Sequence, residues 1–183
     1  MSGYCDKAPG HPIHGSYHDT EYGFPTEDER ALFERMALEI MQAGLSWEIV
    51  LKKRKGLNKA FDKFNAVKVA KYGAKDVKRL LADENIIRNR LKIQAIITNA
   101  NILLEIRKSH KSFAAWIDLH HPRSKEEWVK LFRKQFKFMG GRDRGRVFDE
   151  HWLFAGHAPE DMPRLQDHHE KETGLGGGIA CRS

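Results

Sequence analysis

Hydrophobic residues recur every three to four positions along most of this chain, the spacing of one buried helix face. The first clear stripe lies between residues 32 and 41. Before it, residues 26–29 (TEDE) have the form of a capping box, in which the Thr26 hydroxyl and the Glu29 carboxylate bind the first free amides. Gly44 after it is typical of a helix end. The pattern predicts a helix that starts from this capping box and stops before Gly44.

Four further segments show the same periodicity. Ser46 is placed to cap a second helix. Apolar residues at 77–81 predict a short amphipathic helix, and those at 93–103 predict a longer one. Residues 124–127 (SKEE) form another capping box in front of a further helix. Because no stretch alternates convincingly over the length of a strand, we expect an all-α protein without internal repeats.

Chain length and composition limit the organisation of this protein. Its 183 residues, 40% of them hydrophobic, suffice for one well-cored domain or for two small lobes. We expect a single helical unit over residues 1–173, with a cleft between the lobes if there are two. The glycine-rich residues 174–183 predict a flexible tail. No apolar run approaches the roughly 20 residues that span a bilayer, which predicts a soluble protein without a membrane partner.

The charge balance favours a polyanionic partner. Lys and Arg number 32 against 25 Asp and Glu, which gives a formal charge of +7. A basic surface serves solubility as well as nucleic-acid binding, so the location of the charge matters more than its sum. Basic residues gather at 52–55, at 88–92 and at 142–146.

The segment at residues 83–91 (DENIIRNRL) connects the short helix to the longer one. Asn85 tolerates a left-handed backbone, and the turn delivers amides to the start of a helix rich in Arg and Lys. Free N–H groups and the helix dipole favour a phosphate there. These features predict a helix-hairpin-helix DNA element, although an ordinary turn before a basic amphipathic helix explains them as well.

Glu39 stands inside the otherwise apolar segment at residues 36–47 (MALEIMQAGLSW). Its helical phase places it beside Met36 and Ala43, so we expect partial burial. A carboxylate in a tight aromatic pocket attracts a cationic ligand. The alternative is that Glu39 pairs with a neighbouring Arg or Lys.

Four collinear segments carry a resemblance to a known family. They are YHDTEYG at residues 17–23, LEIMQAGLSW to VLKKR at 38–54, IIRNRLKIQAIITNA at 86–100 and FKFMGG at 136–141. In order and spacing the chain resembles the bacterial 3-methyladenine DNA glycosylase I family, over about residues 5–141. The resemblance fades beyond that range.

The resemblance implies a fold, an activity and a base pocket. The fold would be the helix-hairpin-helix DNA glycosylase fold, a compact helical domain with its N- and C-terminal segments packed together. The activity would be excision of 3-methyladenine from DNA by hydrolysis of the N-glycosidic bond. The implied pocket consists of Tyr17, Tyr22, Trp47 and Glu39, with Glu39 as the residue that acts in catalysis. Leu45 would fill the gap left by the extruded base.

The resemblance also implies a DNA-binding hairpin and a cellular setting. The hairpin residues would be Asn85, Ile86, Arg88, Arg90 and Lys92, and the partner would be double-stranded DNA that carries alkylated bases. We expect a monomer in the bacterial cytoplasm. Two alternatives remain open at this point, a glycosylase-fold protein that binds DNA damage without cleavage and a small helical nucleic-acid adaptor.

Departures from the family pattern concern the pocket and a metal. Tyr22 replaces a tryptophan, and Lys7 stands where the family has another pocket tryptophan. Members often hold a structural zinc, which catalysis does not need. Cys5 and His18 match the first half of its ligand set. The second half, His-x3-Cys, is missing, so the remaining ligands would come from a rearranged tail or no metal binds.

Overall fold

The computed structural model describes residues 8–22, 24 and 26–139. The described residues contain helices and no strand, which confirms the all-α prediction. Cys5, Lys7, the packing of the two terminal segments and the tail at 174–183 lie outside the described residues. The elements are α2 (Gly15–Thr20), α3 (Glu29–Gln42), α4 (Trp47–Ala60), η1 (Asp62–Phe64), α5 (Ala66–Val69), α6 (Ala74–Ala82), α7 (Arg90–His110), α8 (Phe113–Leu119) and α9 (Lys125–Gln135).

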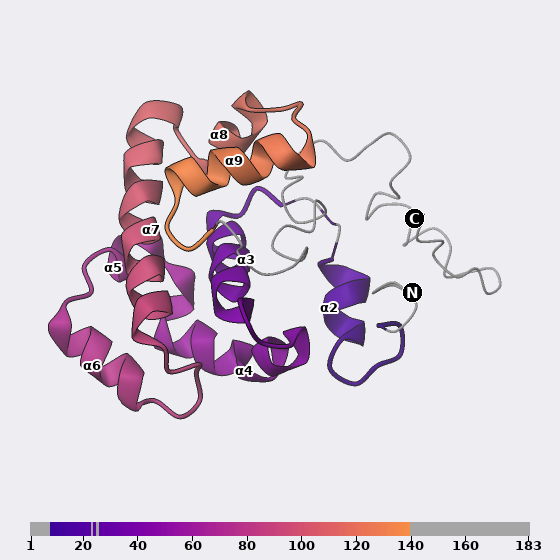
Figure 1. Ribbon diagram of the computed structural model, residues 1–183, viewed down its shortest axis with the longest axis vertical. Coiled ribbons are helices and arrows are strands. Elements are labelled where there is room, and N and C mark those ends of the chain that lie inside the picture. Colours follow the sequence, from indigo (N-terminus) through magenta and orange to yellow (C-terminus); the bar gives the residue numbers. More distant parts are fainter. Residues whose placement is uncertain (1–7, 23, 25, 140–183) are drawn as a thin grey trace.

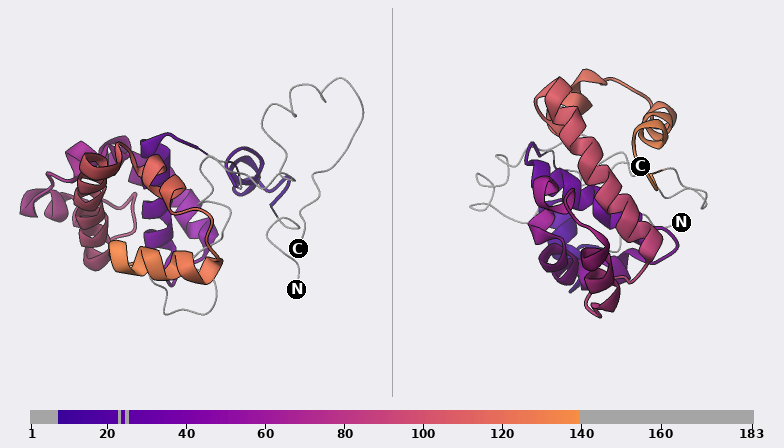
Figure 2. Two further views of the ribbon diagram at one scale, coloured as in Figure 1. Left: turned by 90° about the horizontal axis from the view of Figure 1, so that it is seen from above. Right: turned by 90° about the vertical axis from the view of Figure 1, so that its left-hand side faces the viewer.

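Helix α3 lies in the middle of the molecule, with α7 beside it and α4 crossing below (Figure 1). Helix α7 is the longest of the described helices, and it contacts α3, α5, α6 and α8. Helix α2 lies apart from this bundle, on the side of α3 away from α7, as the view from above confirms (Figure 2). Within the described ranges, no helix has the length and apolar character needed to cross a membrane.

Helix α3 begins two residues later than the capping-box pattern at residues 26–29 predicts. The cap of α3 is Asp28, whose carboxylate accepts a hydrogen bond from the N–H of Arg30 at 2.9 Å. Thr26 instead accepts from the N–H of Asp28 at 3.2 Å. Glu29 does not reach back to a capping position, because Arg107 of α7 binds its carboxylate with Nε at 3.0 Å from Oε1. A tertiary ion pair has replaced the local cap.

The other three helix ends that the sequence predicts are confirmed. Helix α3 ends at Gln42, and Gly44 has a φ of +79°, a left-handed conformation that glycine adopts without strain. The Ser46 hydroxyl caps α4 through the N–H of Ile49 at 3.4 Å. Ser124 and Glu127 form the predicted reciprocal capping box of α9.

A candidate base pocket and DNA hairpin

The three predicted pocket aromatics come together between α2 and the start of α4. The rings of Tyr17 and Trp47 meet edge to face, with centroids 5.4 Å apart. The Tyr22 ring lies 6.3 Å from that of Tyr17. Tyr17 is buried, while Trp47, the first residue of α4, is half-buried. The arrangement brings π systems from two separate elements to one place.

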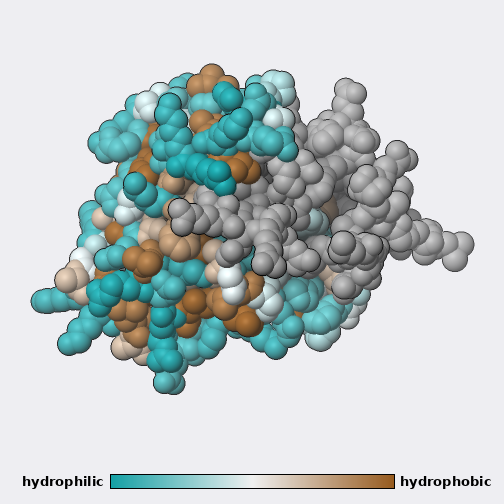
Figure 3. Space-filling model, in the orientation of Figure 1, coloured by the Kyte–Doolittle hydropathy of each residue, from teal (hydrophilic) through white to brown (hydrophobic). Residues whose placement is uncertain are grey.

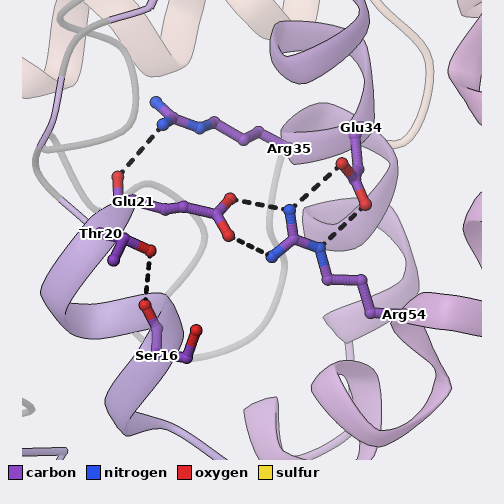
Figure 4. A network of polar contacts seen from close by, with 6 residues as sticks. All are labelled: Ser16, Thr20, Glu21, Glu34, Arg35 and Arg54. Atoms are coloured by element: carbon purple, nitrogen blue, oxygen red, sulfur yellow. Dashed lines mark hydrogen bonds and ion pairs between the residues drawn. The ribbon is translucent and has the colours of Figure 1, made fainter.

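An Arg54-centred network attaches α2 to the helices that carry the rest of the site (Figure 4). The guanidinium of Arg54 donates to both carboxylate oxygens of Glu21 at 2.6 and 2.7 Å, and to those of Glu34 at 2.9 and 3.2 Å. Burial lowers the pKa of Arg54, but the hydrogen bonds that it donates to the two carboxylates outweigh burial and raise that pKa above its usual range. The network therefore joins the end of α2 to α3 and α4 through one permanently charged side chain.

Arg35 makes a second attachment to the same segment. Its side chain is buried and donates to the carbonyl oxygens of Phe24 at 3.0 Å and Glu21 at 3.1 Å. Glu39 lies one helical turn further along α3 and so shares this face. The half-buried Glu39 therefore stands on the side of α3 that is turned toward the segment carrying Tyr17 and Tyr22.

The turn between α3 and α4 places Leu45 next to Trp47. The N–H of Leu45 donates to the Gln42 carbonyl at 2.7 Å, and the Gln42 side-chain amide donates to the Leu45 carbonyl at 3.3 Å. Because these two bonds close a tight turn, the backbone that carries the half-buried Leu45 has a defined position. Apolar side chains gather over α4 and the beginning of α7 on the lower half of the face in Figure 3.

Lys92 is not placed as a surface contact for DNA. Its side chain is only 5% exposed, and its ammonium donates to the carbonyls of Met41 at 2.8 Å and Ala43 at 2.6 Å. Burial lowers the pKa of this ammonium. Lys92 thus binds the last carbonyls of α3, where the negative end of the helix dipole favours a cation. Lys92 therefore holds the turn between α3 and α4 to α7 and is not a DNA contact.

The predicted hairpin is a turn between α6 and α7, but its backbone differs from the expectation. Asn85 is absent from the described non-glycine residues with positive φ, so the left-handed conformation expected there is wrong. Instead, its N–H and its side-chain amide both donate to Asp83 Oδ1, at 2.9 and 3.0 Å. A local Asx-type turn therefore reverses the chain here without a left-handed residue.

The open amides of the hairpin also lie earlier than expected. The Asn89 side chain caps α7 by accepting from the N–H groups of Leu91 and Lys92, so these amides do not face a ligand. Among the hydrogen bonds of the described residues, none uses the N–H of Ile87 or Arg88. Amides left open in the turn just before a helix are suited to bind an anion.

The side chains of the hairpin divide between core and solvent. Ile86 is buried at 3% exposure, so it anchors the turn rather than reaching outward. Arg88 and Arg90 are exposed, and Arg88 makes only a 3.9 Å ion pair with Glu84. The hairpin therefore presents two guanidinium groups beside the open amides of Ile87 and Arg88.

The pattern of a known family covers most of the described chain. It matches residues 7–139 and is that of the methyladenine glycosylases. The chain belongs to the methyladenine glycosylase family.

Named relatives agree with this assignment. DNA-3-methyladenine glycosylase 1 of Escherichia coli (strain K12) is 44% identical over 119 residues, which is 64% of either chain. This member of the family thus spans just under two thirds of the length of the curated relatives it matches. A crystal structure of 3-methyladenine DNA glycosylase I has a TM-score of 0.65 at 38% identity and covers 74% of this chain and 85% of its own. A tyrosine-to-phenylalanine variant of such an enzyme in complex with 3-methyladenine has a TM-score of 0.67 at 29% identity, covering 87% and 95%.

Contacts that the sequence pattern does not reveal hold the hairpin to α4. Lys53 donates to the Glu84 carbonyl at 2.6 Å. Gly56 packs so closely on the hairpin that an added Cβ would lie 2.3 Å from the Asn85 carbonyl oxygen. Arg54, Glu21 and Lys53 all stand inside the segments that carry the family resemblance, so those segments hold structural as well as ligand-facing residues.

The zinc expectation falls partly outside the described residues. His18 is buried, its Nδ1 lies 2.8 Å from Asp19 Oδ1, and its ring stacks on Tyr22 at 5.9 Å. Within the described part of the chain, no group of three or more His, Cys, Asp or Glu side chains is arranged to hold a metal ion. Cys5 and the candidate tail ligands are not among these residues.

Proposed function

We propose that this protein is a monofunctional DNA glycosylase that flips out and excises 3-methyladenine from alkylated duplex DNA. The observation that carries the proposal is the Tyr17–Trp47 edge-to-face pair in a chain of this family. The relatives named above as 3-methyladenine DNA glycosylases support it.

The chemistry suits a pocket that recognises charge. A 3-methylated adenine in DNA carries a positive charge, which weakens its glycosidic bond. Water attacks the sugar carbon, the carbon–nitrogen bond breaks, the base leaves as neutral 3-methyladenine and the water releases a proton. The faces of Tyr17, Tyr22 and Trp47 attract a cationic base through their quadrupoles, and Glu39 accepts hydrogen bonds from its edge. Neutral adenine gains little from either, so the pocket selects the damaged base.

DNA binding in this proposal divides between the turn and the hairpin. Leu45 fills the space that the extruded base leaves in the stack. The open amides of Ile87 and Arg88, together with the guanidinium groups of Arg88 and Arg90, bind backbone phosphates. Such contacts fix the position of the protein on the duplex without reading its sequence.

Glu39→Gln tests the proposal because it removes the charge and keeps the size of the side chain. We expect release of 3-methyladenine from methylated DNA to fall by at least about tenfold, since a hydrogen bond to a charged group contributes about 1.5–3 kcal/mol. Affinity for an abasic duplex should stay unchanged, because phosphates and Leu45 supply it. Glu105→Gln, on the exposed surface of α7, is the matched control and should behave as wild type.

Two other results would contradict the proposal. Equal release by wild type and Glu39→Gln would remove Glu39 from the pocket. No release by the wild-type protein, with duplex binding retained, would favour a damage-binding protein without cleavage. Trp47→Ala adds a second measurement, because loss of one stacking face should weaken binding of free 3-methyladenine by about 1–3 kcal/mol.

The zinc, the monomeric state and the cytoplasmic location stay proposals. A zinc held by Cys5, His18 and ligands from the tail would be structural, and the Asp19 carboxylate on His18 Nδ1 is the kind of partner that orients a ligating imidazole. Elemental analysis of purified protein that finds no zinc, with Cys5→Ser leaving thermal stability unchanged, would remove this proposal.

A further inference from the structure

A second basic surface lies beyond the aromatic cluster, where α3 begins and α4 ends. A surface pocket of about 430 Å³ opens there between α3, α4, η1 and α5. Five cations, one carboxylate and two asparagine amides line it, and the charged members are Arg30, Lys55, Lys59, Lys63, Lys68 and Asp62. We call it the α4–η1 pocket.

The positive charge of the α4–η1 pocket is largely uncompensated. Its one carboxylate, Asp62, accepts from the Tyr72 hydroxyl at 2.6 Å and pairs with Lys68 at 3.5 Å. The side chains of the other four cations make no ion pair or hydrogen bond with any residue of the described chain. A hollow with four such cations and two amide donors has the chemistry of a phosphate site.

The backbone brings these cations together at a cost in free energy. Lys55 and Lys59 are one turn apart on α4 and share a face. Lys63 comes from a turn in which Asp62, Lys63 and Phe64 all have φ between 51° and 53°. A left-handed conformation costs about 1–2 kcal/mol for a residue with a side chain. The stacked rings of Phe61 and Phe64, 5.9 Å apart, and the Tyr72–Asp62 hydrogen bond hold the turn.

The α4–η1 pocket and the hairpin are both attached to α4, since Lys55 and Lys59 line the pocket while Lys53 and Gly56 contact the hairpin. The pKa of Asp83, the first hairpin residue, is lowered by the hydrogen bond from the Asn85 N–H and further by the positive charges of Arg79 and Lys59. Lys59 also lies twelve residues beyond Trp47 on the same helix, about 18 Å at 1.5 Å per residue. Laid along a duplex, this length corresponds to roughly five base pairs at 3.4 Å each.

We propose that the α4–η1 pocket binds backbone phosphates of the DNA duplex roughly five base pairs from the base that the enzyme extrudes. The inference rests on the proposed function for its partner, and it assigns to this pocket a flanking contact separate from the hairpin. The contact lengthens the stretch of duplex that the protein grips and contributes affinity without sequence preference.

A charge-matched pair of variants tests the α4–η1 pocket. The test variant carries Lys55→Gln, Lys59→Gln and Lys63→Asn, because asparagine tolerates the left-handed backbone at position 63. The control carries Lys108→Gln, Lys130→Gln and Lys111→Asn, three exposed lysines of which Lys111 also has a positive φ, of 67°. Each variant lowers the formal charge from +7 by three, to +4.

The measurement is affinity against salt concentration for duplexes centred on an abasic site, one of about 25 base pairs and one of about nine. On the long duplex, the test variant should bind about ten- to a hundredfold more weakly at 0.1 M salt and lose about 2 from the salt slope, since each phosphate contributes about 0.9. On the short duplex, which ends before the pocket, it should match wild type. The control should match wild type on both.

Three results would overturn the inference: an unchanged slope, equal losses in the test and control variants, or equal losses on the long and short duplexes. Thermal unfolding of both variants shows whether they fold. Release of 3-methyladenine is measured in parallel. If wild type releases 3-methyladenine and the test variant keeps the wild-type salt slope, only this inference fails. If the test variant has a lowered salt slope but wild type releases no 3-methyladenine, only the proposed function fails.

Discussion

Gly56→Ala tests whether close packing of α4 on the hairpin positions the DNA-binding residues. An added Cβ would lie 2.3 Å from the Asn85 carbonyl oxygen and 2.9 Å from its carbonyl carbon. An ordinary contact needs about 1 Å more than the shorter distance. The atoms in the way belong to backbone, so the hairpin itself must move.

Two opposing terms set the size of the effect. Alanine is favoured over glycine inside a helix by about 1 kcal/mol. Overpacking costs about 1–3 kcal/mol, and we take the upper end because no flexible side chain yields. The free energy of unfolding should therefore fall by about 2 kcal/mol, which lowers the melting temperature by about 4–8 °C for a chain of this size. Affinity for undamaged duplex should fall as well, because Arg88 and the open amides move with the hairpin.

Calorimetry or thermal unfolding gives the change in stability, and a duplex titration gives the change in DNA affinity. Gly73→Ala is the control, since nothing lies within 4 Å of a Cβ built there and its φ is −111°. It should leave DNA affinity unchanged and alter stability by no more than about 1 kcal/mol. Gly56→Ala that is more stable than wild type and binds DNA equally well would refute the reasoning, because helix propensity would then have exceeded the clash.

Three further predictions concern charged residues of the site. The lysine in Arg54→Lys cannot form the two-carboxylate fork with Glu21 and Glu34, so the free energy of unfolding should fall by about 1–3 kcal/mol. Equilibrium titrations should show weaker binding of free 3-methyladenine and unchanged affinity for duplex DNA. Lys92→Met leaves two carbonyls of α3 without their donor, so chemical denaturation should show a loss of about 1–3 kcal/mol, and a fall in the salt slope of DNA binding would contradict its buried role. Arg88→Glu with Arg90→Glu should weaken binding to all duplexes similarly and lower the salt slope by about 2, and full affinity with an unchanged slope would remove the hairpin from the interface.

Local features of the fold follow from the sequence because they depend on residues a few positions apart. The helix periodicity, the Ser46 cap, the Ser124–Glu127 capping box and the end of α3 before Gly44 are all of this kind. The collinear segments that carry the family resemblance are also visible in the sequence alone. The resemblance predicted the aromatic residues that the fold brings together.

Residues far apart in the sequence determine which charged side chains are buried or paired, because burial and pairing depend on which elements meet in space. Glu29 belongs to a plausible capping box, but Arg107, 78 residues away, binds its carboxylate. Lys92 belongs to a basic cluster, yet carbonyls 49 and 51 residues earlier bind its ammonium inside the protein. The basic residues of α4 divide in the same way: Lys53 contacts the hairpin, Arg54 pairs with two carboxylates, and Lys55 lines the α4–η1 pocket. The sequence determined that these residues are charged and helical, and only the packing of α4 against its neighbours decided which of them remain available to DNA.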